Sequence, residues 1–412
     1  MTPEARVSGV KSSQTTMAGG TLVAAGMMTM NVTVYAFNVL AARLLVPREF
    51  GALTALFGII LVGTVVQLGL QAVTARRLAV APESRGEIIA DTVRVTALAA
   101  AAVGVAVAAT TVVMTPALRL DSYWPVILCG ATLVPMTVMG AQSGIAQGTS
   151  RWGFLTAIYI GNGLGRMVGG TVALLISPTP TSAMIGIAIG AWTPVLAGVY
   201  LLRGHLTQSN RARSRRSMLR EALLSTGTLL AFFVLSNMDA LIARNLLDGH
   251  ESGLYASGLI LAKAAFFFPQ FVSVVLYPDL ARATTHHARL RAVSLVALLG
   301  GLTVAGTVIL PQLALILVGG DEYAAIRDRL WLFAAAGSLL AIVYVLVFDA
   351  LARHAHGVPA MIWCAVAAVL VSAYGLGVGI TGLVVTIIAA SGTLAVMVGA
   401  APLLTRAKPA AD

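Results

Sequence analysis

Long runs of apolar residues, separated by short clusters of charged residues, Pro and Gly, follow one another along nearly the whole chain. A run of roughly 20 apolar residues is long enough to cross a bilayer as an α-helix. The pattern predicts an all-α integral membrane protein with about twelve transmembrane helices. The predicted spans are residues 17–42, 52–75, 93–115, 124–147, 153–176, 181–202, 222–247, 254–280, 292–318, 330–351, 358–378 and 381–404.

One long polar stretch divides these spans into two sets of six. It carries the arginines Arg203, Arg211, Arg213, Arg215, Arg216 and Arg220. We therefore expect an N-terminal six-helix lobe of residues 1–203, a basic cytoplasmic linker of residues 204–221 and a C-terminal six-helix lobe of residues 222–412.

Composition agrees with a membrane protein. The 412 residues are 58% hydrophobic and 10% charged, whereas a soluble domain is about 45–50% apolar and about 25% charged. This composition argues against a soluble globular enzyme. The two cysteines, Cys129 and Cys364, lie far apart in apolar runs, so the sequence suggests neither a disulfide framework nor a metal site.

The net charge of +11 is interpreted as a topology signal rather than as a nucleic-acid-binding face. With the N-terminus inside, eighteen of the 27 Lys and Arg residues fall on the cytoplasmic side of the predicted spans. Six fall outside, namely Arg43, Arg48, Arg119, Arg244, Arg327 and Arg329. Because basic residues in short loops stay in the cytoplasm, we expect both termini there.

Two segments about half a chain apart resemble each other. The chain reads ARLLVPREFGAL from Ala42 and ARNLLDGHESGLYA from Ala243, so that Arg43 precedes Arg244 by 201 positions. Chance similarity between segments rich in Ala, Leu and Gly is the alternative, but the nearly constant offset favours a duplication. A six-helix repeat keeps its orientation, so the two lobes should surround a central cavity about an axis along the membrane normal.

These segments, together with QLGLQAVTARRLA from Gln67 and NMDALIARNLLDGHESGLYASGLILAK from Asn237, resemble the polysaccharide-exporter branch of the multidrug/oligosaccharidyl-lipid/polysaccharide (MOP) transporter superfamily. The resemblance implies a flippase in the bacterial cytoplasmic membrane that moves a lipid-linked sugar precursor to the outer leaflet by alternating access. It implies no cofactor. Implied partners are the lipid-linked sugar, membrane lipids, and glycosyltransferases or a polymerase of the same pathway. Nucleic acid is not among them.

The chain departs from this superfamily in two respects. The first predicted span has no acidic residue, unlike the cation-coupling carboxylate of some drug exporters. A peptidoglycan-precursor flippase is expected to have a cavity rich in arginine. The candidate cavity positions of this chain are not rich in arginine.

Three charged side chains lie deep inside predicted spans, where each is costly unless it faces a partner or a cavity. Asp239 and Lys263 lie roughly 12–14 Å from the same end of a helical hairpin, given a rise of 1.5 Å per residue. They could form an ion pair that substrate or a proton breaks, or a permanent pair that fixes the hairpin. Arg166 could bind a diphosphate group or pair with another helix.

Several uncharged amides also lie within the spans. Their side chains could donate hydrogen bonds to sugar hydroxyls or join neighbouring helices, and for each one singly the second role is the commoner. These residues are Asn31, Asn38, Gln67, Gln71 and Asn237.

Other functions are weighed against the flippase. The closest is a cation-coupled multidrug antiporter of the same superfamily, which the missing acid in the first span disfavours. A membrane enzyme of polysaccharide synthesis would need a larger outer loop with carboxylates or arginines, and the sequence has no catalytic constellation or P-loop. We therefore expect no enzyme activity.

Overall fold

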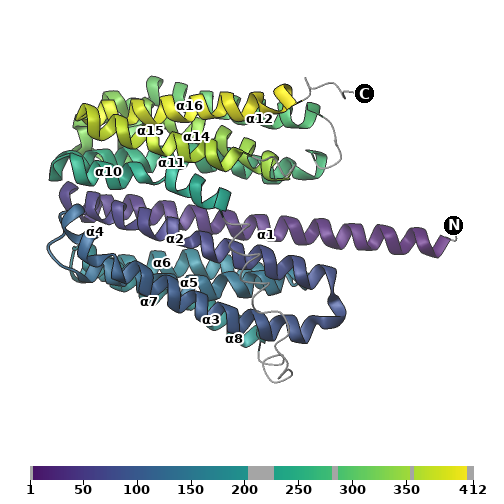
Figure 1. The fold of residues 1–412 in the computed structure, drawn as a ribbon. Coiled ribbons are helices and arrows are strands. Elements are labelled where there is room, and N and C mark those ends of the chain that lie inside the picture. The colour runs from purple at the N-terminus through teal and green to yellow at the C-terminus, as the bar shows by residue number, and fades with distance from the viewer. Residues whose placement is uncertain (1–2, 203–226, 281–285, 353–356, 406–412) are drawn as a thin grey trace.

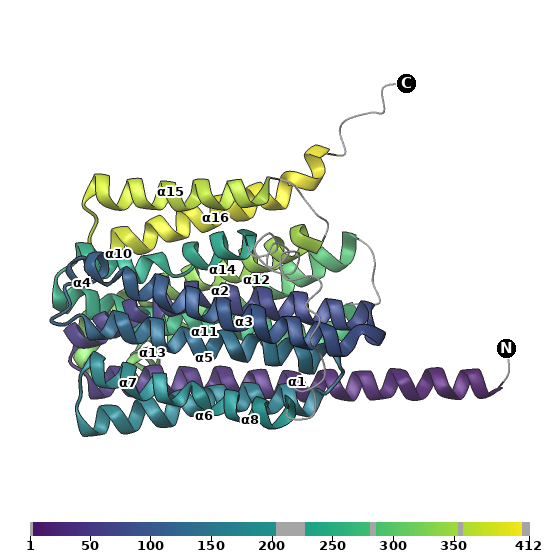
Figure 2. The same ribbon diagram turned by 60° about the horizontal axis from the view of Figure 1, so that its bottom comes forward.

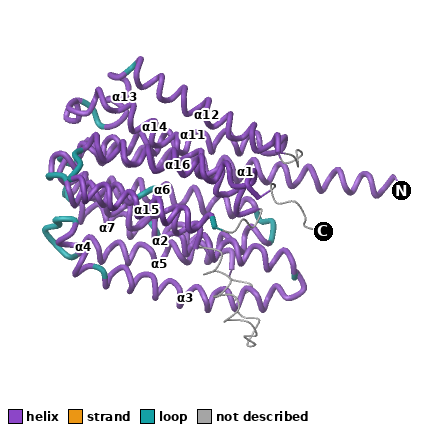
Figure 3. The backbone as a smooth tube through the Cα atoms, turned by 45° about the horizontal axis from the view of Figure 1, so that its top comes forward, coloured by secondary structure: helices purple, strands orange, loops and turns teal. Residues whose placement is uncertain are grey.

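The computed structural model describes residues 3–202, 227–280, 286–352 and 357–405 (Figure 1). Throughout these ranges the chain folds into helices joined by short loops, and no strand is present in them (Figure 3). The predicted linker, residues 204–221, lies outside the described residues, as do the first residues of the seventh predicted span.

The N-terminal lobe contains the helices that occupy the first six predicted spans. They are α1 (Pro3–Leu44), α2 (Pro47–Val80), α3 (Arg85–Ala109), α4 (Thr111–Ala117), α5 (Trp124–Gly148), α6 (Trp152–Ile176), α7 (Pro180–Gly190) and α8 (Trp192–Leu202), with a 3-10 turn at Pro82–Ser84.

The C-terminal lobe begins with a helical span at Gly227–Leu246. The described part of this lobe further comprises α10 (Met238–Leu246), α11 (Gly249–Leu280), α12 (His286–Ile309), α13 (Pro311–Val318), α14 (Leu330–Ala352), α15 (Val358–Leu376) and α16 (Ile380–Thr405), with the 3-10 segment η2 at Asp321–Arg329.

The predicted fold class is confirmed. Among the described residues, ten helical segments are long and apolar enough to cross a membrane. The remaining two predicted spans, residues 153–176 and 254–280, coincide with the long helices α6 and α11. Helices are therefore present at each of the twelve predicted positions.

The two lobes pack in corresponding ways. In the N-terminal lobe α5 contacts both α2 and α3, and in the C-terminal lobe α14 contacts both α11 and α12. Figure 1 shows the C-terminal lobe stacked on the N-terminal lobe, with α1, α2, α10 and α11 along the interface. At that interface α11 packs against α1 and α2, and α10 packs against α2. Figure 2 shows α15 and α16 at one edge of the molecule.

Four predicted spans contain breaks that the apolar pattern did not reveal. The breaks lie at Thr110, Ala191, Asn237 and Leu310. Leu310 precedes Pro311 and leaves helical geometry, with φ −123° and ψ 58°, because the ring of a proline crowds a helical residue before it. Thr110 and Leu310 are 200 positions apart, close to the repeat offset read from the sequence.

Glycines allow very close helix contacts inside the N-terminal lobe. A Cβ on Gly186 would overlap the carbonyl oxygen of Gly169, and a Cβ on Gly190 would overlap that of Gly165. Both contacts join α6 to the segment around α7. Small residues with this spacing are typical of tightly packed helices in membranes.

Candidate functional site

The break in the seventh span is stabilised by side chains of the break itself. Asn237 has φ −136° and ψ −6°, outside the helical region. Its Nδ2 donates to the carbonyl of Phe233 at 2.8 Å and to Oγ of Ser236 at 3.0 Å. Asn and Ser side chains compete in this way with the backbone hydrogen bonds of a helix. The break therefore frees backbone polar groups of the seventh span for other partners.

Lys263 of α11 binds to this break. Its Nζ donates to the carbonyl of Ser236 at 3.1 Å and to Oδ1 of Asn237. An ammonium group has three donors and no acceptor, so it suits a carbonyl and an amide oxygen at a helix break. This contact places Lys263 beside Asn237, two residues before Asp239, which agrees with the similar depth that the sequence predicts for Asp239 and Lys263.

Asp239 and Lys263 do not form the hypothesised direct ion pair: the described residues contain no contact between them within the salt-bridge distance of 4.0 Å. Oδ1 of Asp239 accepts from the backbone N–H of Ala240 at 2.9 Å, and Oδ2 accepts from the hydroxyl of Tyr255 at 3.3 Å. The correction has a geometric cause: the amide of Asn237 takes the ammonium, while the carboxylate caps the first turn of α10.

The break lies at the contact between the lobes. A Cβ on Gly58 of α2 would come within 3.2 Å of the backbone carbonyl of Asn237. The backbone at the break therefore lies against α2 of the N-terminal lobe. Transporter binding sites are often built from discontinuous helices at the boundary between repeats.

Arg166 of α6 lies against aromatic side chains of α1 and α2 in the N-terminal lobe. Its guanidinium carbon lies 4.1 Å from the ring centre of Phe57 and 5.7 Å from that of Phe37. Within the described part of the chain it forms no hydrogen bond or ion pair, and its buried Nε has no partner. Aromatic faces stabilise a desolvated cation, but they leave the donors of the guanidinium free for an anionic group.

Two of the five amide side chains are hydrogen-bonded, and three have no hydrogen bond within the described residues. Asn237 is fully engaged at the helix break, as described above. Gln71 donates to Oε1 of Gln147 at 3.3 Å and to the hydroxyl of Tyr159 at 3.0 Å, so it joins α2 to α5 and α6. Gln67 is buried, and its Oε1 has no partner among the described residues. Asn31 and Asn38 are half-buried on α1, and neither side chain is hydrogen-bonded within the described ranges.

Tyr255 was missed by the sequence-based reasoning. It is fully buried, packs edge-on against Phe333 at 5.1 Å, and presents its hydroxyl to Asp239. No residue pattern marks a tyrosine in an apolar helix as the partner of a carboxylate. The only sequence feature that pointed toward this contact was the position of Asp239, two turns before a predicted hairpin.

A surface pocket of about 700 Å³ lies away from these residues, between the start of α6 and residues 19–22 of α1. Trp152 and Phe154 line it together with Arg151. It is open and mainly apolar. We do not assign it to the candidate site.

Comparison with solved structures covers nearly the whole chain. An inward-facing multidrug resistance MATE family transporter of the MOP superfamily matches with a TM-score of 0.68 at 11% identity, over 95% of this chain and 100% of that one. An outward-facing MATE transporter matches at 0.57 and 14% identity, over 95% and 97%. The inward closed conformation of the lipid II flippase MurJ matches at 0.73 and 11% identity, over 93% and 87%.

The chain shares the fold of these MATE transporters and of MurJ. No protein-family model matches the sequence, and no curated protein sequence matches it. The solved structures named above are transporters and a flippase. At these identities the likeness establishes the fold and leaves the substrate open.

Proposed function

We propose that this MOP-fold protein is a flippase that moves a lipid-linked oligosaccharide or polysaccharide precursor across the bacterial cytoplasmic membrane by alternating access. The polysaccharide-exporter branch, both cytoplasmic termini and the pathway partners belong to this proposal. The resemblance of the segments around Gln67 and Asn237 to that branch supports it. So does the chemistry of the charges inside the bundle.

The proposal rests on one observation: the charged side chains that a ligand could contact are positive, while the carboxylate is already hydrogen-bonded. Lys263 is half-buried beside the interface between the lobes, while Asp239 is buried and hydrogen-bonded to Tyr255. Arg166 has no anionic partner within the described residues. A diphosphate group could therefore find charge-assisted donors in both lobes, whereas a cationic drug would meet cations.

A cation-coupled multidrug antiporter is the second candidate, and one observation favours it. Asp239 is a buried carboxylate at a helix break, a position suited to binding and releasing a proton or cation. The lack of an acidic residue in the first span argues against it.

The two candidates differ in what accumulates when the protein is lost. Lipid-linked sugar intermediates would be compared between cells with the gene, cells without it, and cells carrying Lys263→Gln. Accumulation on the cytoplasmic leaflet in the last two strains supports the flippase. Unchanged intermediates together with altered drug sensitivity would identify the antiporter.

A further inference from the structure

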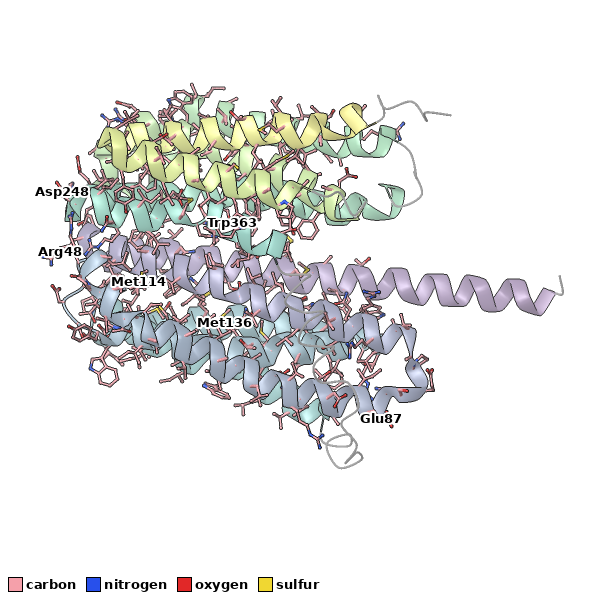
Figure 4. The ribbon with its side chains drawn as sticks, in the orientation of Figure 1. Arg48, Glu87, Met114, Met136, Asp248 and Trp363 are labelled. Atoms are coloured by element: carbon pink, nitrogen blue, oxygen red, sulfur yellow. The ribbon has the colours of Figure 1, made fainter. Side chains whose placement is uncertain are left out.

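One end of the bundle carries hydrogen bonds between the two lobes that the candidate site does not include. Figure 4 shows Arg48, at the start of α2, and Asp248, after α10, at the end remote from the N-terminus, whereas Glu87 lies toward the other end. The lobes touch closely here, because a Cβ on Gly253 of α11 would overlap the carbonyl of Pro47.

Arg244 of the C-terminal lobe donates to three backbone carbonyls of the N-terminal lobe. Its Nε donates to Leu118 at 2.8 Å, its Nη1 to Arg48 at 3.0 Å and its Nη2 to Arg119 at 3.3 Å. Ser252 provides a further acceptor within its own lobe at 3.1 Å. Only 3% of Arg244 is exposed, so the guanidinium is held by carbonyls rather than by a carboxylate.

Arg119 makes the reciprocal contact. From the N-terminal lobe it donates Nη1 to the carbonyl of Leu247 at 2.8 Å and Nη2 to that of Asn245 at 2.7 Å. Asn245 in turn donates to the carbonyl of Ala117 at 2.7 Å. Arg119 has φ +48°, a left-handed conformation that is unfavourable for a residue with a side chain. The backbone of Arg119 is therefore strained at the point where its side chain crosses between the lobes.

The counterpart of Arg244 in the first repeat behaves alike. Arg43 of α1 donates to the carbonyl of Ile316 in α13, at 2.9 Å. Beside it, the hydroxyl of Tyr323 donates to the carbonyl of Ala42 at 2.9 Å. The duplicated arginines therefore each reach the end of a short helix in the opposite lobe, α4 for Arg244 and α13 for Arg43.

Helix C-termini explain this choice of acceptors. The last carbonyls of a helix have no partner within the helix and carry partial negative charge. A guanidinium, with five donors in a fixed plane, can bind several of them at once. The end of α4 receives Arg244 and Asn245, and the end of α10 receives Arg119.

We propose that Arg43, Arg119 and Arg244 form a clasp that closes this end of the interface between the lobes, and that alternating access requires its hydrogen bonds to break. With the predicted topology, this is the extracytoplasmic gate. The proposal concerns the motion of the MOP fold and does not depend on the substrate proposed above. Because the acceptors are uncharged carbonyls, the clasp should not open by protonation of its acceptors.

The test measures distances by double electron–electron resonance in vesicles. Spin labels on cysteines at Tyr123 and Asp328 report the clasp end, and labels at Glu87 and Leu290 report the opposite end, after Cys129 and Cys364 are replaced by Ala. All four labelled residues are exposed. Arg244→Lys and Arg119→Ala are compared with Arg327→Ala, whose exposed side chain pairs only with its neighbour Asp328 in the described structure; for this control the label at position 328 is moved to Asp321.

In both clasp variants the population with separated ends at 123 and 328 should rise about tenfold or more relative to the closed one, while the distance between 87 and 290 shortens. Arg327→Ala should leave both distributions unchanged relative to a protein that retains Arg327 and carries the same labels at 123 and 321. Unchanged distributions in folded Arg244→Lys overturn the proposal. If that buried substitution prevents folding, Arg119→Ala decides, because its side chain is exposed, and unchanged distances there overturn the proposal equally.

Discussion

Lys263 reaches across the hairpin of the C-terminal lobe and donates to Oδ1 of Asn237 and to the carbonyl of Ser236, while the neighbouring Asp239 bonds to Tyr255. The ammonium therefore closes a helix break, and the carboxylate has partners of its own. Lys263 can therefore act through its hydrogen bonds to the break or through its positive charge, and different variants test the two roles.

Lys263→Met should destabilise the protein by about 1–3 kcal/mol, because the carbonyl of Ser236 and Oδ1 of Asn237 lose their donor. Lys263→Gln can restore one neutral hydrogen bond, so we expect a folded protein that no longer transports an anionic substrate. Thermal unfolding and transport would be measured on both. Asp239→Asn and the double variant complete the set, and near-normal transport in Lys263→Gln and Asp239→Asn would exclude a functional role for these charges.

Arg166→Gln should strongly reduce stabilisation by an anionic ligand, because only Lys263 of the two cations then remains. In the wild-type protein a lipid diphosphate at 100 times its Kd should raise stability by about 2.7 kcal/mol. Arg166→Lys keeps the charge but not the planar group that lies over Phe57, and should retain a weakened response. Thermal shifts with and without the lipid diphosphate measure this. An equal shift in wild type and Arg166→Gln would show that the guanidinium does not contact the ligand.

Gly186→Ala and Gly190→Ala should each destabilise the N-terminal lobe by about 1–3 kcal/mol, because the added Cβ overlaps a backbone carbonyl of α6. Gly301→Ala is the matched control, since a Cβ there meets nothing within 4 Å in α12. It should be neutral or stabilising by up to about 1 kcal/mol. Thermal unfolding in detergent compares the three, and equal stabilities would contradict the close helix contact.

Gly253→Ala should separate the lobes without unfolding either one, because its Cβ overlaps the Pro47 carbonyl of the opposite lobe. Gly249→Ala is the control: the Cβ there meets the side chain of Arg48, which can move aside. Distances between labels at Tyr123 and Asp328 should lengthen only in the first variant. Loss of folding in Gly253→Ala with normal folding of the control would instead assign this contact to stability.

The orientation in the membrane can be tested by labelling. In a variant lacking Cys129 and Cys364, a cysteine at Tyr123 should react with a membrane-impermeant maleimide in intact cells. A cysteine at Glu83, which is also exposed but lies at the other end of α3, should react only after permeabilisation. The reverse pattern would place the termini outside.

The sequence located the helices well because each span depends on a local property, a run of apolar residues about as long as the bilayer is thick. It did not locate the breaks at Thr110 and Asn237, since both residues are tolerated in a helix. Pro311 did carry a signal for the break at Leu310, which the apolar pattern outweighed. Lys263 and Arg166 could be identified as candidates because a charged residue inside an apolar span stands out. Their contact partners could not be predicted from the sequence.

The sequence by itself determined that the chain is a bundle of membrane-spanning helices and indicated a repeat of about 201 residues, because apolar length and spacing are written into residue types. Only the tertiary structure decided that Lys263 binds Asn237 rather than Asp239, and that Arg244 crosses to the other lobe. The acceptors of Arg244 in that lobe are backbone carbonyls, which every residue possesses. No pattern of side chains can therefore identify them, and the packing of the two lobes alone brings them within reach.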